Sequence, residues 1–349
     1  MTTARPHGGR VWAALAAGIL LLAASIVLAA GIGSVHYSPH RVLAAVLHGM
    51  PRDSDTDDAL ITVWDLRLPR IVMAALVGAS LAAAGVALQC LFRNDLSDPY
   101  IVGVSSGASV GAEAVLMKHA DGRLHGAAVP IAAFVTGVAS ILTVYGMARK
   151  RGRVMVTTLL LSGVIVSSFL GAVSTLLLEI GNTNDSSDSF HIMMRLMGSF
   201  QSATFDDRGM LWMGLSLAVG IGILMSQASS MNVFSLGEEQ AAQLGVDVER
   251  FKSILIAASA LMTATSVAVA GVIGFVGLVV PHMCRRIAGT PDHRRVLPLS
   301  AVTGAILLVW ADTIARSVPG GQELPVGVVT AFVGAPFFCY LLRRRLASE

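Results

Sequence analysis

The stretch SILIAASALMTATSVAVAGVIGFVGLVVPHMC, residues 253–284, contains no Asp, Glu, Lys or Arg. A helix needs about 20 apolar residues to cross roughly 30 Å of hydrocarbon. These 32 residues are therefore too many for one upright helix and few for two. Gly271 and Gly274 favour a bend in the stretch, and Pro281 follows. Because one crossing or two decides the side on which every later segment lies, this stretch decides the fold.

The composition of the whole chain points to a membrane protein. Its 349 residues are 54% hydrophobic and only 13% charged, whereas soluble domains carry about 25% charged residues. This excludes a soluble enzyme, a disordered regulator and a disulfide scaffold. The three cysteines, Cys90, Cys284 and Cys339, lie singly and without metal-ligand spacing, so we expect no metal site.

Long apolar stretches recur along the chain and predict its membrane helices. Those free of Asp, Glu, Lys and Arg are 11–33, 71–92, 124–148, 154–178, 209–237, 253–284 and 324–342. Two others, 99–117 and 296–315, are interrupted only by Glu113 and Asp312. The stretch 11–33 could instead be a cleaved signal sequence ending near Ala29-Ala30-Gly31, but its apolar core is long for one and we expect it to be retained.

Basic clusters decide how often the stretch 253–284 crosses. They lie at 149–153, 285–295 and 343–345, and the positive-inside rule places all three in the cytoplasm. Only a split at about 271–274 puts them on one side, which predicts ten helices with both termini cytoplasmic. In that arrangement the inner loops hold 16 of the 25 Lys and Arg residues, and the outer loops hold 14 of the 22 Asp and Glu residues.

Two runs of small residues suggest internal symmetry. Residues 77–87 (VGASLAAAGVA) and 258–270 (ASALMTATSVAVA) each lead into a short helix punctuated by Gly and Pro. In the ten-helix arrangement the two runs point in opposite directions, as inverted repeats around a transport pathway do. Chance similarity between helices rich in Ala and Gly is the alternative.

The chain carries no recognisable machinery for chemistry. It has no GxxxxGK[ST] phosphate loop, no HExxH and no nucleophile elbow, so neither an integral-membrane enzyme nor an ATPase is expected. Active transport would need a partner subunit or an ion gradient. A gradient-driven carrier would use intramembrane acids, but Glu113 and Asp312 are expected near outer helix ends, where water reaches them or a local partner binds them.

Several long motifs resemble one family of transporters. They are Arg67-Leu68-Pro69-Arg70 with GASLAAAG and Gln89, then NDLSDP (94–99), GVSSGAS (103–109), LGEE (236–239), GFVGLVVPH (274–282), the pairs Asp312-Thr313 and Ala315-Arg316, and ELPVGVVTAFVGAPFF (323–338). From about residue 60 to 345 the chain resembles the FecCD family, the membrane permeases of ABC importers for ferric siderophores, haem and cobalamin. Asp95 departs from the family, which usually has proline after the asparagine.

The resemblance implies an all-α integral membrane protein with the type II ABC importer permease fold. Residues 1–349 would form a single transmembrane permease domain of ten helices with inverted repeats, with a short cytoplasmic N-terminus at 1–10. Two copies, or this chain and a paralogous permease, would enclose the pathway in the cell inner membrane. A periplasmic or lipid-anchored binding protein would deliver cargo, and two ATP-binding subunits would hold ATP and magnesium.

The permease itself would hold no cofactor and bind no nucleic acid. Ferric siderophore is expected as cargo because it is the commonest in the family, with haem and cobalamin as alternatives.

A short polar helix is predicted within the loop 228–252. Glu238, Glu239 and Gln243 are spaced to line one side of it, Ala241, Ala242 and Leu244 offer small apolar surface, and Gly245 suits a helix end with an unusual backbone angle. A solvated connector is the alternative. The resemblance implies an ATPase-coupling helix formed by Leu236, Gly237, Glu238, Glu239, Ala242, Leu244 and Gly245.

Three arginines predicted to lie on the outer side are exceptions to the positive-inside rule. Arg67, Arg70 and Arg316 stand at the outer ends of predicted helices, and guanidinium groups pair well with carboxylates. The resemblance implies that they bind a glutamate on each lobe of the binding protein. Anchoring to lipid headgroups is the alternative.

By resemblance, Asn94, Leu96 and Thr157 belong to a cytoplasmic gate, with helix capping by Asn94 or Thr157 as the alternative. His191, Met193, Met194 and Met197 would suit a transient haem ligand, but their spacing favours a short helix seated on the membrane or the gate.

Overall fold

The computed structural model describes residues 8–33, 35–49, 58–118, 125–150, 152–181, 196–205, 208–318 and 323–346. The long helices are α1 (Gly8–Gly31), α4 (Leu68–Phe92), α5 (Val104–Lys118), α6 (His125–Ala148), α7 (Val156–Gly181), α9 (Arg208–Phe234), α11 (Val248–Ala270), α12 (Val276–Ala288), α13 (His293–Ala315) and α14 (Val326–Leu346). Short elements are α2 (Pro39–His48), α3 (Asp58–Ile61), η1 (Thr62–Arg67), η2 (Pro99–Val102), β1 (Arg149–Lys150), β2 (Arg153–Val154) and α10 (Glu238–Gln243).

Each of the ten predicted membrane segments corresponds to one of the long helices. Seven helical spans in the described residues are long and apolar enough to cross a membrane alone, and α5 and α14 contain shorter apolar stretches. The tenth helix is α12, which follows α11 after a non-helical break. The expected ten-helix, all-α architecture is confirmed, and the described residues add to it only the two-residue strands β1 and β2.

The stretch 253–284 is split as its sequence predicts. Helix α11 ends at Ala270, and α12 begins at Val276. Gly271 (φ +73°) and Phe275 (φ +67°) adopt left-handed backbone angles that a continuous helix forbids. Glycine takes such an angle without cost, so Gly271 is the natural place for the helix to stop.

Neighbouring segments bind the backbone of this break. The Val272 N–H donates to Leu196 O, and the Ser199 N–H donates to Ala270 O, each at 2.9 Å. Tyr100 of η2 donates its hydroxyl hydrogen to Ile273 O at 3.1 Å. Non-helical backbone at membrane depth is tolerated where it is satisfied within the protein, and here η2 and residues 196–199 supply the partners.

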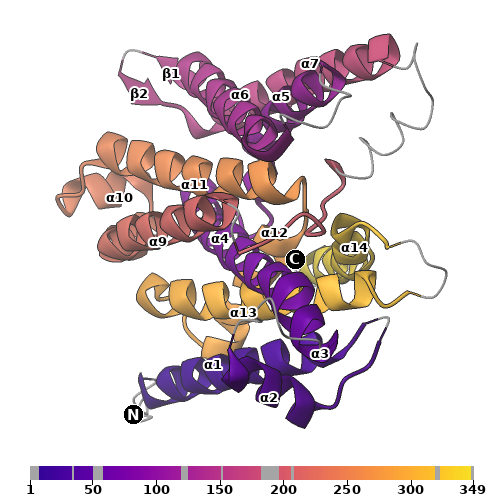
Figure 1. Cartoon of the computed structure of the whole chain (residues 1–349). Coiled ribbons are helices and arrows are strands. Elements are labelled where there is room, and N and C mark those ends of the chain that lie inside the picture. The colour runs from indigo at the N-terminus through magenta and orange to yellow at the C-terminus, as the bar shows by residue number, and fades with distance from the viewer. Residues whose placement is uncertain are drawn as a thin grey trace.

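Helix α4 is the interior helix of the fold. In the span 62–92, which contains α4, 83% of the most apolar 18 residues are buried. In the spans of α1 and α7 the same share is 17%. It runs diagonally through the molecule, with α5–α7 on one flank and α1 and α13 on the other (Figure 1). The small residues of the run 77–87 therefore serve packing between helices, as small residues do in membrane proteins.

Glycines set the distance between α4 and its neighbours. A Cβ added at Gly78 would lie 2.2 Å from the backbone oxygen of Gly304 on α13. One added at Gly85 would lie 2.0 Å from the backbone oxygen of Gly277 on α12. Both contacts are backbone against backbone, so neither neighbour can move a side chain aside.

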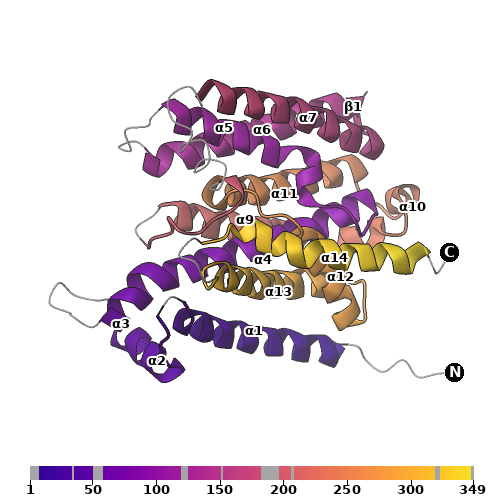
Figure 2. The same cartoon turned by 90° about the vertical axis from the view of Figure 1, so that its right-hand side faces the viewer.

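The described basic segments meet at one end of the molecule, which we call the basic end. The Val154 N–H donates to Glu249 at 2.7 Å, Arg294 donates to Ser229 at 2.6 Å, and Arg285 pairs with Asp95 at 3.2 Å. Helix α10, β1 and the described end of α14 lie on this side, while α2 and α3 lie on the opposite side, the far end (Figure 2). This grouping is the one that the split stretch predicts.

We predict that Gly85→Leu lowers the melting temperature of the purified protein, because its side chain would enter the backbone of α12. Overpacking of this kind costs about 1–3 kcal/mol or more. Gly146→Leu on α6 is the matched control, since nothing lies within 4 Å of a Cβ there. Equal melting temperatures for the two variants in detergent would contradict the packing role of Gly85.

Candidate functional site

Helix α10 projects from the basic end with apolar side chains at both of its edges. Leu236 is 67% exposed and Leu244 is 64% exposed, and Glu239 and Ala242 between them are also exposed. Ala241 is buried, contrary to the expectation that it belongs to the exposed surface; it fastens the helix to the protein body. These two leucines are exposed apolar groups that a partner docking on α10 could contact.

Buried Lys252 holds α10 in place. Its ammonium group, on the first turns of α11, donates to Glu238 at 2.6 Å, Glu249 at 3.1 Å and the backbone oxygen of Val154 at 3.0 Å. Lys252 is only 1% exposed, so three oxygens compensate the buried charge. Sequence reasoning missed this residue; the signal was a lone lysine at the start of an apolar stretch.

Glycines bound α10 on both sides. Gly237, before its first residue, has φ +133°, and Gly245, after its end, has φ +86°. The expectation of an unusual backbone angle at Gly245 is confirmed. A rigid, short helix between two glycines, anchored by an ion pair, is suited to transmitting a push from a bound partner. The coupling role itself stays a prediction.

At the far end, Arg70 and Arg316 share one carboxylate. The Arg70 Nε atom donates to Asp312 at 2.8 Å, and the Arg316 Nε atom lies 3.5 Å from the other Asp312 oxygen. Arg70 also pairs with Glu323 at 2.7 Å, and Gln201 donates to the same Glu323 oxygen at 2.9 Å. Glu323 and Gln201 are additional members of this cluster that the sequence did not single out.

This far-end cluster is charged and mostly buried. Burial alone would raise the pKa of the Glu323 carboxyl, but the hydrogen bonds from Arg70 and Gln201 hold that pKa below its usual value. Burial lowers the pKa of Arg316 to about 10 despite the nearby Asp312. Both groups therefore stay ionised at neutral pH.

Arg67 is buried against the segment after α1. Its guanidinium donates to the backbone oxygens of Ala30, at 2.6 Å, and Val35, and it lies 5.1 Å from the centre of the Tyr37 ring. Arg67 is 5% and Arg70 is 8% exposed. All three predicted docking arginines thus lie at the far end and are bound within the chain, and docking through them stays a prediction.

The expectation that water reaches Asp312 and Glu113 is wrong. Asp312 is 0% exposed, because Arg70 and Arg316 enclose it, and Glu113 is 1% exposed. The alternative of a local partner is the one that holds: Asp312 has its two arginines, and Glu113 accepts a hydrogen bond from Ser174 of α7.

The predicted gate residues lie at the basic end. Asn94 follows α4, and its side chain accepts from the Leu96 N–H at 3.1 Å in a tight local turn. Thr157 is exposed in the first turn of α7. Asn94 stabilises its own turn, and the contribution of these residues to a gate stays a prediction.

Asp95 gives the turn after α4 a fixed partner. Arg285 of α12 contacts Asp95 at 3.2 Å and also donates to Gln89 of α4 at 2.6 Å. Gln89 in turn donates to Gly277 O and Leu278 O, each at 3.1 Å. The carboxylate that stands where the family usually has proline is thus tied to α12 by an ion pair.

A cavity of about 810 Å³ lies between α5, α7, α14 and the break after α11. Glu113, Ser109 and Ser174 line part of its wall, and Met197, Phe275 and Phe332 are among its apolar lining residues. His191, Met193 and Met194, which were considered with Met197 as haem ligands, lie outside the described residues. The cavity is large enough for part of a bulky ligand.

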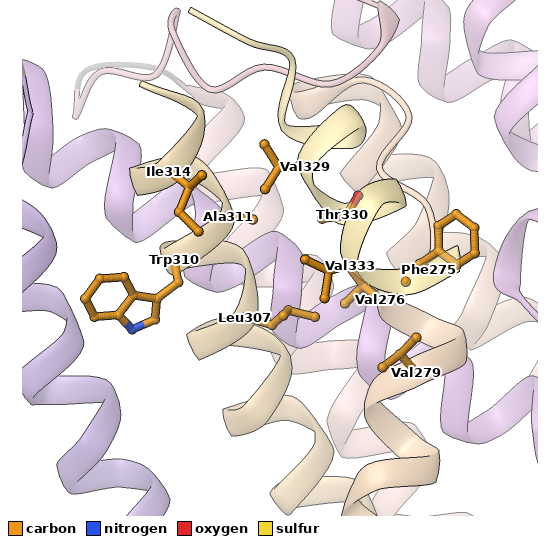
Figure 3. Close-up of a pocket in the computed structure, with 11 residues that line it drawn as sticks. Phe275, Val276, Val279, Leu307, Trp310, Ala311, Ile314, Val329, Thr330 and Val333 are labelled. Carbon is orange, nitrogen blue, oxygen red and sulfur yellow. The ribbon is translucent and has the colours of Figure 1, made fainter. Parts of the chain in front are cut away.

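A second cavity is too small for cargo. It measures about 70 Å³ between α12, α13 and α14 and is lined by apolar side chains such as Val279, Leu307 and Val333, with Thr330 as a polar neighbour (Figure 3). Ligand pockets measure about 300–1,000 Å³. This space is a packing gap between α14 and its neighbours.

Known proteins match the chain along most of its length. The FecCD transport family profile matches residues 20–344. The cobalamin import system permease protein BtuC of Halobacterium salinarum is 46% identical over 290 residues, which are 83% of this chain and 75% of that protein. The uncharacterized ABC transporter permease protein YvrB of Bacillus subtilis is 39% identical over 346 residues, which are 96% of this chain and 94% of that protein.

The fold matches as well. A solved ABC transporter described as of metal-chelate type, in an inward-facing conformation, aligns with a TM-score of 0.81 at 30% identity, covering 95% of this chain and 98% of that chain. The expected fold of type II ABC importer permeases is therefore confirmed. Since family profile, relatives and solved fold agree over most of the chain, this chain belongs to the FecCD transport family of ABC importer permeases.

Proposed function

We propose that this chain is the membrane subunit of an importer that moves cobalamin, or a metal chelate of similar bulk, into the cell. The observation that carries the proposal is its 46% identity to a cobalamin import permease. The permease BtuC of the vitamin B12 import system of Vibrio cholerae is also 42% identical, over 81% of this chain and 82% of that protein. These relatives favour cobalamin over the ferric siderophore expected from family frequency.

The proposed assembly has two copies of the chain in the inner membrane, with the pathway between them. Two ATP-binding subunits would dock at the basic end on α10, whose exposed Leu236 and Leu244 supply apolar contact. A binding protein would dock at the far end, where Arg67, Arg70 and Arg316 gather. Both termini would be cytoplasmic, because the described ends of α1 and α14 lie on the α10 side (Figure 2).

A gradient-driven carrier is the competing function, and the pairing of Asp312 disfavours a coupling ion at that residue. Such a carrier needs an intramembrane acid that is free to bind its coupling ion. Asp312 is already paired with Arg70 and Arg316, so a cation there would have to compete with two guanidinium groups. We therefore favour ATP hydrolysis by a partner subunit as the energy source for transport.

Uptake in proteoliposomes tests the proposal. With its ATPase and binding protein, the chain should accumulate cyanocobalamin only when ATP is present on the side of the membrane that the ATPase subunits face. A ferric siderophore should not compete with this uptake. The control is the chain alone under a proton or sodium gradient. Accumulation by the chain alone would overturn the importer proposal, and preferential uptake of the siderophore would overturn the cargo.

We predict that Gly245→Val uncouples ATP hydrolysis from uptake. A branched residue at φ +86° costs about 1–2 kcal/mol, so the end of α10 should shift and its push on the membrane helices should weaken. Cobalamin uptake per ATP hydrolysed should fall several-fold. Gly289→Val is the control, since Gly289 ends α12 at the same end with φ +62°. Equal loss in both variants would contradict a coupling role for α10.

We predict that Arg316→Gln weakens docking of the binding protein by roughly tenfold or more, because a hydrogen bond to a charged group contributes about 1.5–3 kcal/mol. Arg41→Gln removes a positive charge from an exposed position on α2 at the same end. Docking is measured by surface plasmon resonance on the complete complex, with its ATPase rate as the check on assembly. Equal weakening by both substitutions would indicate general attraction rather than a socket.

A further inference from the structure

The 810 Å³ cavity has a polar patch on an otherwise apolar wall. Ser109 and Glu113 stand one helical turn apart on α5, so they share a face, and Ser174 approaches from α7. Among the described residues that line the cavity, Glu113 alone is ionisable. The patch is in the half of the protein toward the far end, since Glu113 lies close to the last residue of α5.

One oxygen of the Glu113 carboxyl has no partner. Oε1 accepts the hydroxyl hydrogen of Ser174. Oε2 is buried, as is the whole residue, which is only 1% exposed. It accepts no hydrogen bond within the described protein. An unsatisfied buried acceptor is costly, and native proteins rarely keep one without a reason. Glu113 is one of the residues that line the cavity.

The chemistry of this oxygen restricts what it can bind. A carboxyl oxygen accepts hydrogen bonds from N–H groups and attracts cations, while it repels carboxylates and other anions. Corrinoids carry several primary carboxamide groups, each with two N–H donors. Catecholate and carboxylate chelates of iron are anionic. Glu113 should therefore attract the carboxamides of a corrinoid and repel an anionic iron chelate.

We propose that Glu113 is a selectivity site in the transport cavity, where its free oxygen accepts a hydrogen bond from a carboxamide of the cargo and its charge excludes anionic chelates. This inference rests on the proposed function. Ser174 positions the carboxyl by fixing Oε1, and Oε2 is the oxygen left without a partner. Selection by repulsion needs few contacts, which suits a wall that must release its cargo again.

The experiment compares cyanocobalamin with its monocarboxylic acid, in which one carboxamide has been hydrolysed to a carboxylate. The complete importer is reconstituted in liposomes and supplied with binding protein saturated beforehand with either ligand, so that capture does not limit uptake. We expect the wild-type protein to import the acid roughly tenfold more slowly, which corresponds to about 1.4 kcal/mol. In Glu113→Gln, of the same size but uncharged, most of that difference should disappear.

Two further variants separate charge from packing. Glu113→Asp keeps the charge and should keep the discrimination against the acid. Glu179→Gln makes the same exchange on an exposed residue of α7 that does not line the cavity, and it should behave as the wild-type protein does. The ATPase rate of each complex reports that it has assembled.

The outcomes are distinct. Wild-type protein that imports cobalamin and its acid at equal rates overturns the role of Glu113 but leaves the proposed function standing, and this result needs no variant to fold. Equal discrimination by the wild-type protein and Glu113→Gln also overturns it. A wild-type importer that carries neither corrinoid overturns the proposed function itself, and the inference with it.

Discussion

A side chain larger than hydrogen at Gly78 or Gly85 would collide with the backbone of Gly304 or Gly277, and the arrangement of the other helices depends on this close approach. With backbones nearly touching, α13 and α12 sit directly against α4 rather than a side-chain layer away. Gln89, one turn beyond Gly85, then reaches the Gly277 and Leu278 carbonyls. In lipid, where no hydrophobic force drives helices together, packing of this kind supplies the attraction.

The break after α11 depends on the same interior packing. Its backbone groups would be costly in hydrocarbon, but residues 196–199 and Tyr100 accept or donate the hydrogen bonds that a helix would have provided. The segment 196–199 also receives the start of α14, because the Val326 N–H donates to Gly198 O at 2.8 Å. The break, the start of α14 and the wall of the large cavity are therefore one connected region.

Charge is handled differently in the three parts of the molecule. At the basic end, Lys252 is neutralised by Glu238 and Glu249 and fastens α10. At the far end, Asp312 is neutralised by Arg70 and Arg316. Between them, Glu113 keeps one oxygen without a partner beside a cavity. The paired charges fix the packing at the two ends of the molecule, and the unpaired oxygen is the group that we propose contacts the cargo.

The amino-acid sequence by itself determined the ten membrane segments, the split near Gly271 and the grouping of the basic segments at one end. These depend on segment length, apolar character and the sign of charge, which are local properties. The family also followed from motifs read along the chain.

Only the tertiary structure decided the partners of the charged residues. Arg70 and Asp312 are 242 positions apart in the chain, so no local pattern pairs them, and Lys252 meets Val154 across 98 positions. For the same reason the sequence misjudged Asp312 and Glu113 as reached by water: a helix end is wet or dry according to what packs on it. The free oxygen of Glu113 exists because Ser174, on another helix, satisfies only the other one.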